Sequence, residues 1–289
     1  MEHASRTPVD LVIQPRNLMF GRGPPTNRWW NGSDPIATAF YNGMSVAFPQ
    51  GEAFFIESVR KFRDTVPVHQ QAQIDAFIKQ EAAHSREHTH FNKRVQEAGY
   101  DVLSIETHLA ARFAKAKNAL PVVNLATTVA LEHFTAIIAH AILESDRHLK
   151  DASTDAAYLW KWHAIEEIEH KGVAYDTFLA ATEGLSSYKR WKFRALVMLH
   201  LSYTFVRGRV RAMRQFLEQD GMDGPRTGLR IFWYLWIYPG LLRQIFPAWL
   251  SFFQPRFHPW QHDDRDLVAA HEAQLGLPVL NKDTLVRLA

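Results

Sequence analysis

Two short stretches decide the fold of this chain: Glu81-Ala82-Ala83-His84 and Glu167-Ile168-Glu169-His170. Each is a Glu-x-x-His motif, and on an α-helix this spacing places the carboxylate and the imidazole one turn apart on the same face. Both motifs occupy positions of an apolar helical stripe where the period of the helix expects a core residue. The sequence therefore predicts two helices that direct carboxylates and imidazoles toward the protein interior.

Four predicted helices carry an apolar stripe that such polar side chains interrupt. Glu52 interrupts the stripe of the first helix and Glu132 that of the third, while the two Glu-x-x-His motifs interrupt the second and the fourth. An unpaired buried carboxylate costs more free energy than a domain can offset, so it must be protonated, paired or bound to a cation. Pro49 and Gly51 predict a kink or a restart in the first helix. The four helices cover about residues 36–64, 69–98, 121–149 and 154–182.

We expect the polar side chains of these stripes to converge and to hold two metal ions. Glu52 precedes Glu81 by 29 residues and Glu132 precedes Glu167 by 35. Each interval is about one helix out and one helix back, so both pairs can lie at similar depth. Two Glu-x-x-His motifs, with one Glu from each of two further helices, are the ligand set of di-iron carboxylate proteins with a ferritin-like four-helix bundle. The six expected ligands are Glu52, Glu81, His84, Glu132, Glu167 and His170.

Other polar residues are expected beside these ligands. His163 lies one turn before Glu167 and is a candidate seventh ligand, with a role in orienting Glu167 as the alternative. A buried salt-bridge network without metal, or Glu and His on a solvated face, would also place these residue types in helices. Four further side chains are expected to contact the ligands and orient them: His88, Glu57, His133 and Glu166.

The residue types restrict the metal and its chemistry. The chain has no cysteine, so thiolate ligands and disulfides are excluded, and a metal must be held by nitrogen and oxygen. Four carboxylates with imidazoles suit two Fe ions best, with Mn or Zn as alternatives, and suit Mg²⁺ or Ca²⁺ poorly. Iron would activate O₂, whereas Mn or Zn would activate water for hydrolysis. No G-x-S-x-G, P-loop or G-x-G-x-x-G motif is found, so nucleotide chemistry is disfavoured.

The organisation of the chain follows from its periodicity and composition. With 289 residues and 47% hydrophobic content the chain can bury a large core, and helical periodicity after residue 35 predicts an all-α fold. Two further helices, about 187–219 and 226–253, and a short one near 264–275 follow the first four. The expected parts are an extended lead-in (1–35), a four-helix metal-binding bundle (36–185), a basic aromatic helical extension packed on the bundle (186–256) and a C-terminal tail (257–289).

The extension is unusually basic and aromatic. Residues 186–256 contain 12 Lys and Arg against three acids, and four tryptophans. One explanation is that its helices cover the bundle and form a substrate tunnel. The other is an interfacial surface that binds anionic lipid, which would make the protein peripheral at the inner membrane face. Nucleic acid is not an expected partner, because no known binding module is present.

The beginning of the chain and its apolar runs bear on localisation. Residues 1–16 lack an apolar stretch behind a basic start, so a secretory signal is not expected and the cytoplasm is the predicted compartment. The uncharged apolar runs at residues 195–206, 231–242 and 244–255 have 12 residues each, against roughly 18 for a spanning helix. We therefore expect a soluble or surface-bound protein.

The motifs resemble those of a bacterial family of predicted metal-dependent hydrolases, over roughly residues 10–265. The pattern His163-x-x-x-Glu167-x-x-His170 is also similar to the additional-histidine pattern of the di-iron N-oxygenases. Ferritin storage cages lack a long basic C-terminal segment, so the resemblance implies an enzyme rather than an iron store. The stretches that carry the resemblance are residues 48–55, 79–88, 131–134 and 162–171.

Three functions are expected from these observations, in this order. The first is a non-haem di-iron oxidase or monooxygenase that uses O₂ and a separate electron-donating reductase to oxidise a hydrophobic small molecule. The second is a metal-dependent hydrolase that uses the same dinuclear site. The third is a non-enzymatic metal-binding protein associated with the membrane. Neither the substrate nor the oligomeric state follows from the sequence, and a homodimer is left open.

Overall fold

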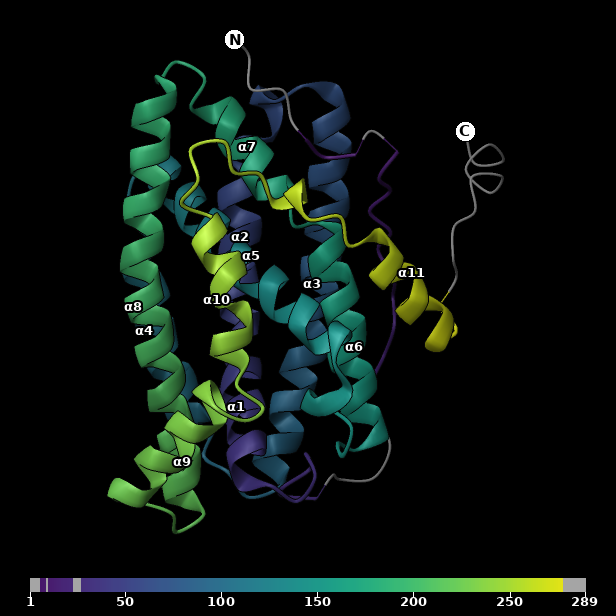
Figure 1. The fold of residues 1–289 in the computed structure, drawn as a ribbon, viewed down its shortest axis with the longest axis vertical. Helices are drawn as coiled ribbons and strands as arrows, with labels where there is room; N and C mark the ends of the chain where they lie inside the picture. The colour runs from purple at the N-terminus through teal and green to yellow at the C-terminus, as the bar shows by residue number, and fades with distance from the viewer. Residues whose placement is uncertain (1–5, 9, 23–26, 278–289) are drawn as a thin grey trace.

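The chain is all-α over the part that the computed structural model describes, residues 6–8, 10–22 and 27–277. No β-strand forms within that part, and a single antiparallel bridge joins Asn31 to Ala152. Most of the long helices run along the long axis of the molecule (Figure 1). The helices in chain order are α1 (Pro35–Ser45), α2 (Phe48–Arg60), η1 (Arg63–Thr65), α3 (Val68–Glu97), α4 (Leu103–Lys117), α5 (Pro121–Glu144), η2 (Asp146–His148), α6 (Thr154–Glu169), α7 (Val173–Ala181), α8 (Ser187–Gln219), α9 (Pro225–Trp236), α10 (Leu241–Ser251), η3 (Pro259–Gln261) and α11 (Arg265–Gln274).

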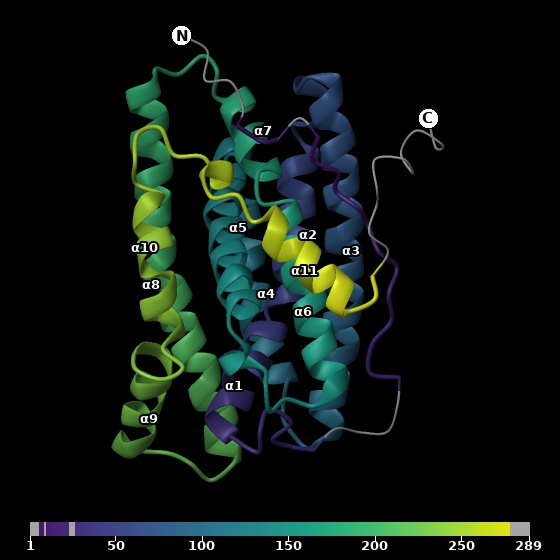
Figure 2. The same cartoon turned by 45° about the vertical axis from the view of Figure 1, so that its right-hand side comes forward.

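The four helices with interrupted stripes, α2, α3, α5 and α6, pack against one another in the middle of the molecule. α2 lies against α3 and α5, and α6 lies against α5 and α3, as two views of the ribbon show (Figures 1 and 2). Their apolar faces include Phe77, Leu125 and Leu159, each at most 1% exposed. The prediction of an all-α fold is confirmed, and the narrower assignment to a ferritin-like bundle stays a prediction.

Three of the predicted helices are interrupted. The first restarts near the predicted position: α1 ends before Val46, and Pro49 lies in the first turn of α2, where its missing N–H leaves no bond unmade. The fourth is divided into α6 and α7 around Gly172, where a Cβ would lie 2.7 Å from Thr7 Oγ1. The helix predicted at 226–253 is divided into α9 and α10 at Gly240, whose φ of 73° is left-handed.

Helix α4 was not predicted from the sequence. It packs against α2 and buries Ile105 and Leu109, with Phe113 and Ala116 partly buried on the same side. These four residues follow the i, i+4, i+8, i+11 spacing of a helix face. The periodic signal was therefore present, between turn-forming residues at Gly99 and Pro121.

The C-terminal helices cover the central four helices from two sides. α8 lies against α1 and α5, and α10 lies against α5 and α9. α11 lies against α6 and α5, next to the segment of residues 10–22 that runs beside α3 (Figure 2). In that segment Phe20 places its ring 5.0 Å from the ring of Trp162.

One helix of the described chain is long and apolar enough to span a membrane. This helix is α5, and 78% of its most apolar window is buried inside the protein. Helix α5 reaches this length and hydropathy although Glu132 divides it into two uncharged stretches. Burial by the surrounding helices is typical of a core helix.

Candidate metal centre

The structure brings the six expected ligands together in the interior. α2 contributes Glu52, α3 contributes Glu81 and His84, α5 contributes Glu132, and the end of α6 contributes Glu167 and His170. None of the six is more than 3% exposed. The alternative interpretation, that these Glu and His residues lie on solvated helix faces, is therefore wrong.

Helix α3 shows why the sequence directs these side chains inward. Its buried positions include Phe77, Glu81, His84, His88 and Phe91, which follow the spacing of one helix face. Apolar packing at both ends of that face holds the helix against its neighbours and carries the polar residues between them into the interior.

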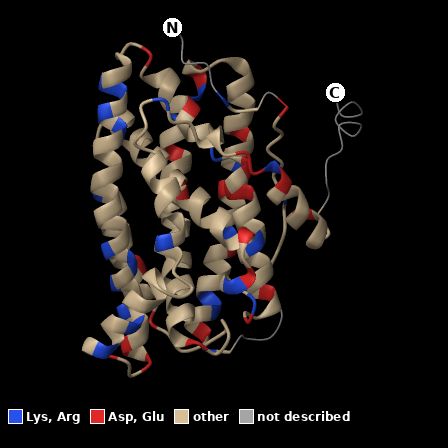
Figure 3. Cartoon of the chain, viewed as in Figure 1, with Lys and Arg blue, Asp and Glu red and all other residues tan. Residues whose placement is uncertain are grey.

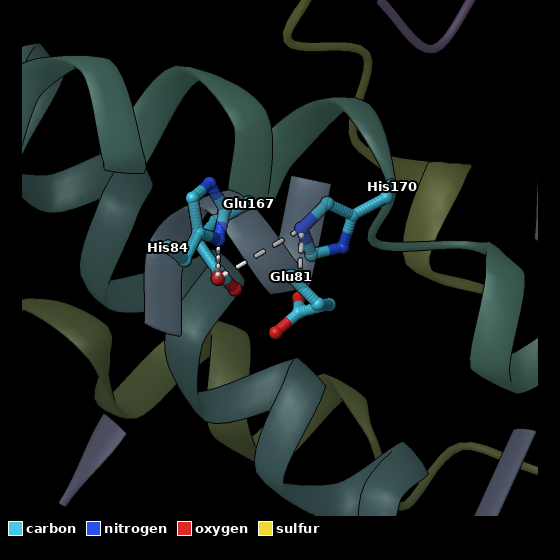
Figure 4. A group of neighbouring side chains, drawn as sticks. All are labelled: Glu81, His84, Glu167 and His170. Carbon is cyan, nitrogen blue, oxygen red and sulfur yellow. Dashed lines mark ion pairs between the residues drawn. The ribbon is translucent and has the colours of Figure 1, made fainter. Parts of the chain in front are cut away.

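Four of the ligand residues form a close group, drawn in Figure 4. The imidazole of His84 and the carboxylate of Glu167 face each other, with 3.6 Å between Nδ1 and Oε1. His170 Nε2 lies 3.2 Å from Glu81 Oε1 and 3.8 Å from Glu167 Oε1. One ligand atom from each of the four residues lies within 4.8 Å of the other three, which is close enough for one cation to contact several of them.

The two remaining carboxylates adjoin this group. Glu132 Oε2 lies 3.1 Å from His170 Nδ1. Glu52 forms a second close group with His84 and His163, again with ligand atoms within 4.8 Å of one another. His84 belongs to both groups, and Glu132 contacts His170, so the six residues form one continuous cluster.

Many oxygen and nitrogen atoms of the cluster that could bind a metal have no hydrogen-bond partner in the described part of the chain. This is unusual, since buried polar atoms in proteins are nearly always hydrogen-bonded. Metal coordination would satisfy all of them, so the residues present fit a bound metal. The unpartnered atoms are both carboxylate oxygens of Glu52 and of Glu81, Nδ1 of His84, Oε1 of Glu132, Oε2 of Glu167 and Nε2 of His170.

The electrostatics of the metal-free cluster show the cost of burying these charges. Burial, reinforced by the neighbouring carboxylates, raises the pKa of Glu81 and of Glu52 well above the usual range. Burial also raises the pKa of Glu132 to about 7. Two divalent cations would neutralise four carboxylates and remove this repulsion.

The pKa values of His170 and His84 are shifted in opposite directions. Burial opposes the charged form of His170, but Glu132 and Glu167 outweigh it and raise its pKa to about 9. Burial likewise opposes ionisation of Glu167, yet His170 and His163 lower its pKa to about 2. Burial lowers the pKa of His84 well below its usual range. A neutral His84 keeps a nitrogen lone pair for a metal.

His163 and His88 form a hydrogen-bonded chain beside the cluster. His163 Nε2 lies 2.8 Å from Glu167 Oε1, and its Nδ1 lies 2.7 Å from His88 Nε2. His88 Nδ1 continues the chain to the hydroxyl of Ser45 at 2.9 Å, and that hydroxyl donates to Asn92. His88 thus reaches the cluster through His163. Both nitrogens of His163 are engaged, which favours its role in orienting Glu167 over that of a seventh ligand.

Glu166 contacts the ligands as expected, and it is linked to residues that the sequence reasoning missed. Its Oε2 lies 3.0 Å from His84 Nε2. Its Oε1 accepts hydrogen bonds from Arg16 and from Trp162 Nε1. Arg16 is buried and also pairs with Glu169 and Glu272. It lies in an extended segment without periodicity, so no sequence pattern identifies it.

Two of the expected orienting residues do not contact the cluster. Glu57 is on the surface, with 41% of its side chain exposed, and pairs with Lys61 and Lys117. At 100° per residue it lies about 140° around α2 from Glu52, which explains the error. His133 Nε2 donates to the backbone oxygen of Ala248 at 3.1 Å, and its ring packs on aromatic rings of the C-terminal segment, because α5 turns it away from the direction of Glu132.

A third group of candidate ligands lies outside this cluster, and its carboxylate is paired with other side chains. His140, His262 and Asp264 bring donor atoms within 4.8 Å of one another. The Asp264 carboxylate is already paired with the ammonium group of Lys171 and with His140. These pairs satisfy the carboxylate without a metal.

One of the comparisons with known proteins agrees with a metal-binding site. Residues 14–263 match the model of a family described as predicted metal-dependent hydrolase. No curated protein and no solved structure matches the chain significantly. Because the family match covers most of the chain, the protein belongs to the family of predicted metal-dependent hydrolases.

Proposed function

We propose that the protein is a metal-dependent hydrolase with a dinuclear centre. The observation that carries the proposal is the group of eight buried donor atoms without hydrogen-bond partners in the described chain. The family description supports hydrolysis, which was the second of the functions expected from the sequence. The metal ligands in this proposal are Glu52, Glu81, His84, Glu132, Glu167 and His170.

The chain's own residues would orient the ligands and keep the centre dry. When bound, two dications supply an activated water and polarise the bond to be cleaved. Glu166 holds the His84 ring through Nε2 and so directs Nδ1 into the cluster. His163 holds one oxygen of Glu167 and leaves the other free. Phe48 packs its ring 4.6 Å from that of His163 and shields this side from water.

The donor set leaves the metal identity to experiment. Carboxylates with imidazoles bind Fe, Mn and Zn, and four carboxylates balance the charge of two divalent ions. Elemental analysis of protein purified from its native host should give close to two such ions per chain. Glu81→Ala and Glu167→Ala should abolish this content, and Glu57→Ala, which changes a surface carboxylate on α2, should retain it. Full metal content in the first two variants would refute the dinuclear centre.

An O₂-dependent oxidase is the second candidate, and the carboxylate-rich donor set is the observation that favours it. The family description gives it no support. A hydrolase should cleave p-nitrophenyl esters or bis-p-nitrophenyl phosphate in the absence of O₂, and Mn or Zn reconstitution should sustain turnover. Glu81→Ala should lose that activity.

The same assay separates the remaining functions. Consumption of O₂ with a supplied electron donor, and no hydrolysis under anaerobic conditions, would replace the hydrolase with the oxidase. Bound metal with neither activity would favour a non-enzymatic metal-binding protein.

A further inference from the structure

An apolar cavity of about 170 Å³ lies between α2, α4, α5 and α8. Its wall includes several aromatic rings and contains two arginines but no acidic residue. Cavities of this kind, apolar with a few convergent polar groups, are typical of small-molecule sites. The aromatic residues of the wall are Phe48, Phe54, Phe55, Phe113 and Phe205.

The cavity adjoins the candidate metal centre. Phe48 and Phe55 line it from α2 and lie one turn either side of Glu52, on the same face of the helix. Leu131 lines it from α5, next to Glu132. Because Phe48 and Phe55 share the face of α2 that carries Glu52, a molecule in the cavity would extend toward the Glu52 carboxylate.

The two arginines of the wall, Arg209 and Arg112, lack an acidic partner. The Arg209 side chain donates to the backbone oxygen of Gly43, and it is only 9% exposed. Its Nε is buried without a hydrogen-bond partner in the described part of the chain. Burial and the positive charge of Arg112 lower the pKa of Arg209 to about 10. Neither arginine forms an ion pair with any described acidic residue.

Capping of α1 does not account for this arrangement. The bond from Arg209 to Gly43 satisfies one carbonyl near the end of that helix, a common use of arginine. It leaves Nε unsatisfied, and it gives no reason for a second arginine to stand nearby. Two adjacent guanidinium groups at an apolar cavity match an anion better, because each can donate to a carboxylate or phosphate.

We propose that this cavity binds an elongated apolar molecule with one anionic group, a carboxylate or a phosphate, held by Arg209 and Arg112. The apolar part lies among the aromatic rings, and its far end approaches the metal centre. The identification of this molecule as the substrate rests on the proposed hydrolase function. Its binding in the cavity does not depend on that function.

Binding to the metal-loaded full chain tests the proposal. Calorimetry with dodecanoate, dodecyl phosphate and dodecanol should show at least tenfold tighter binding of an anion than of the alcohol. Preference for one anion over the other identifies the group. Arg209→Met should remove the preference, Arg112→Gln should weaken it severalfold, and Arg211→Gln, an exposed arginine of α8 outside the cavity, should leave it unchanged.

Two results would overturn this inference: equal binding of the anions and the alcohol, or an anion preference that survives both cavity variants. If Arg209→Met does not fold, the exposed Arg112→Gln decides alone. Binding is measured without turnover, so a failed hydrolase assay with intact anion binding refutes only the proposed activity.

A different observation concerns the outer face of α9. This helix buries Ile231, Tyr234 and Leu235, yet its opposite side is also apolar. Leu229, Phe232, Trp233 and Trp236 follow the i, i+3, i+4, i+7 spacing of one face, and they are 69, 55, 59 and 38% exposed. A stripe of this kind on a helix usually faces another apolar phase. The same surface continues with Ile237, Tyr238, Phe246 and Leu250.

Cations accompany this stripe. Arg226, Arg230 and Arg243 are exposed or partly exposed, and none of them pairs with a described acidic residue. Lys and Arg are frequent along α8 and α9 at the left edge of Figure 3. A second copy of the chain joined face to face would bring these arginines against each other, so anionic lipid is the better match.

We infer that the outer face of α9, with the adjacent residues of α10, docks the protein on an anionic bilayer. Tryptophan rings suit the headgroup level, and the arginines reach lipid phosphates. Full-length protein should co-sediment with vesicles that contain phosphatidylglycerol and much less with pure phosphatidylcholine. The double variant Phe232→Ser/Trp233→Ser should lose at least tenfold in binding, and Arg226→Gln/Arg230→Gln should weaken it and reduce its salt dependence.

The matched control is Leu103→Ser, an exposed leucine at the start of α4, which should bind as the wild type does. No sedimentation with anionic vesicles, or unchanged sedimentation of the Phe232→Ser/Trp233→Ser variant, would refute the docking surface. Light scattering that shows a dimer dissociated by that double variant would identify the face as a contact between copies instead.

Discussion

The carboxylate of Glu166 lies 3.0 Å from Nε2 of His84, on the side of the ring opposite the cluster of candidate ligands. Nδ1 of the same ring faces Glu167 and has no hydrogen-bond partner in the described chain. A carboxylate that holds one nitrogen of an imidazole, while the other nitrogen is free, is the usual arrangement behind a metal-binding histidine. This relationship orients the ring so that Nδ1 points into the cluster.

Replacing Glu166 with Gln should therefore weaken metal binding without removing a ligand. Loss of such a partner typically lowers metal affinity about 10- to 100-fold, and competition with a chelator measures the change. Glu57→Gln serves as the control, because Glu57 pairs with surface lysines. An affinity equal to that of the wild type would show that Glu166 serves only Arg16.

Removal of the metal should destabilise the protein. Four buried carboxylates lose the cations that neutralise them, and a ligand at 100 times its Kd contributes about 2.7 kcal/mol to the native state. For a chain of this size that corresponds to roughly 5–10 °C in Tm. Thermal melting with and without a chelator measures the loss, and Ca²⁺ should not restore it. Glu81→Ala should melt at the same temperature with and without chelator, and a chelator-dependent Tm in that variant would contradict the ligand assignment.

The helices and the cluster could be predicted because both depend on the helical period. Apolar residues such as Phe77 and Phe91 determine which face of α3 is buried, and that face carries Glu81 and His84 with it. The same period placed Glu57 away from Glu52, so the expectation that it supports the ligands could have been rejected from the sequence. Helix α4 also carried a periodic signal, at Ile105 and Leu109.

Contacts made by non-helical segments could not be predicted in this way. Arg16 lies in an extended stretch whose neighbours in space are about 150 and 250 residues away in sequence. No period or local spacing connects it to Glu166 or Glu272. The break between α6 and α7 depends similarly on Gly172, whose packing against Thr7 and Trp260 is determined by distant segments.

Arg16→Gln should cost a large part of the protein's stability. The Arg16 guanidinium is 3% exposed and pairs with Glu166, Glu169 and Glu272, and removing one partner of a buried charge network typically costs about 3–5 kcal/mol. Urea denaturation measures the loss. Arg265→Gln removes an arginine whose side chain is 47% exposed and pairs with surface aspartates, and it should change stability by less than about 1 kcal/mol. Equal losses in the two variants would show that the buried network contributes nothing specific.

His148, which is not one of the candidate metal ligands, should make the stability of the protein depend on pH. Burial lowers its pKa below the model-peptide value of 6.5, and Nε2 pairs with Gln244 Oε1 at 3.2 Å. The unfolded chain therefore binds a proton at a higher pH than the native protein does. This contribution to stability is complete above pH 6.5 and is lost as the pH falls from 6.5 through the lower native pKa. Urea denaturation from pH 7.5 to 5 should show a shallower decline for His148→Gln than for the wild type. His69→Gln, an exposed histidine at the start of α3, should follow the wild-type profile, and parallel profiles for all three proteins would show that His148 is protonated equally in both states.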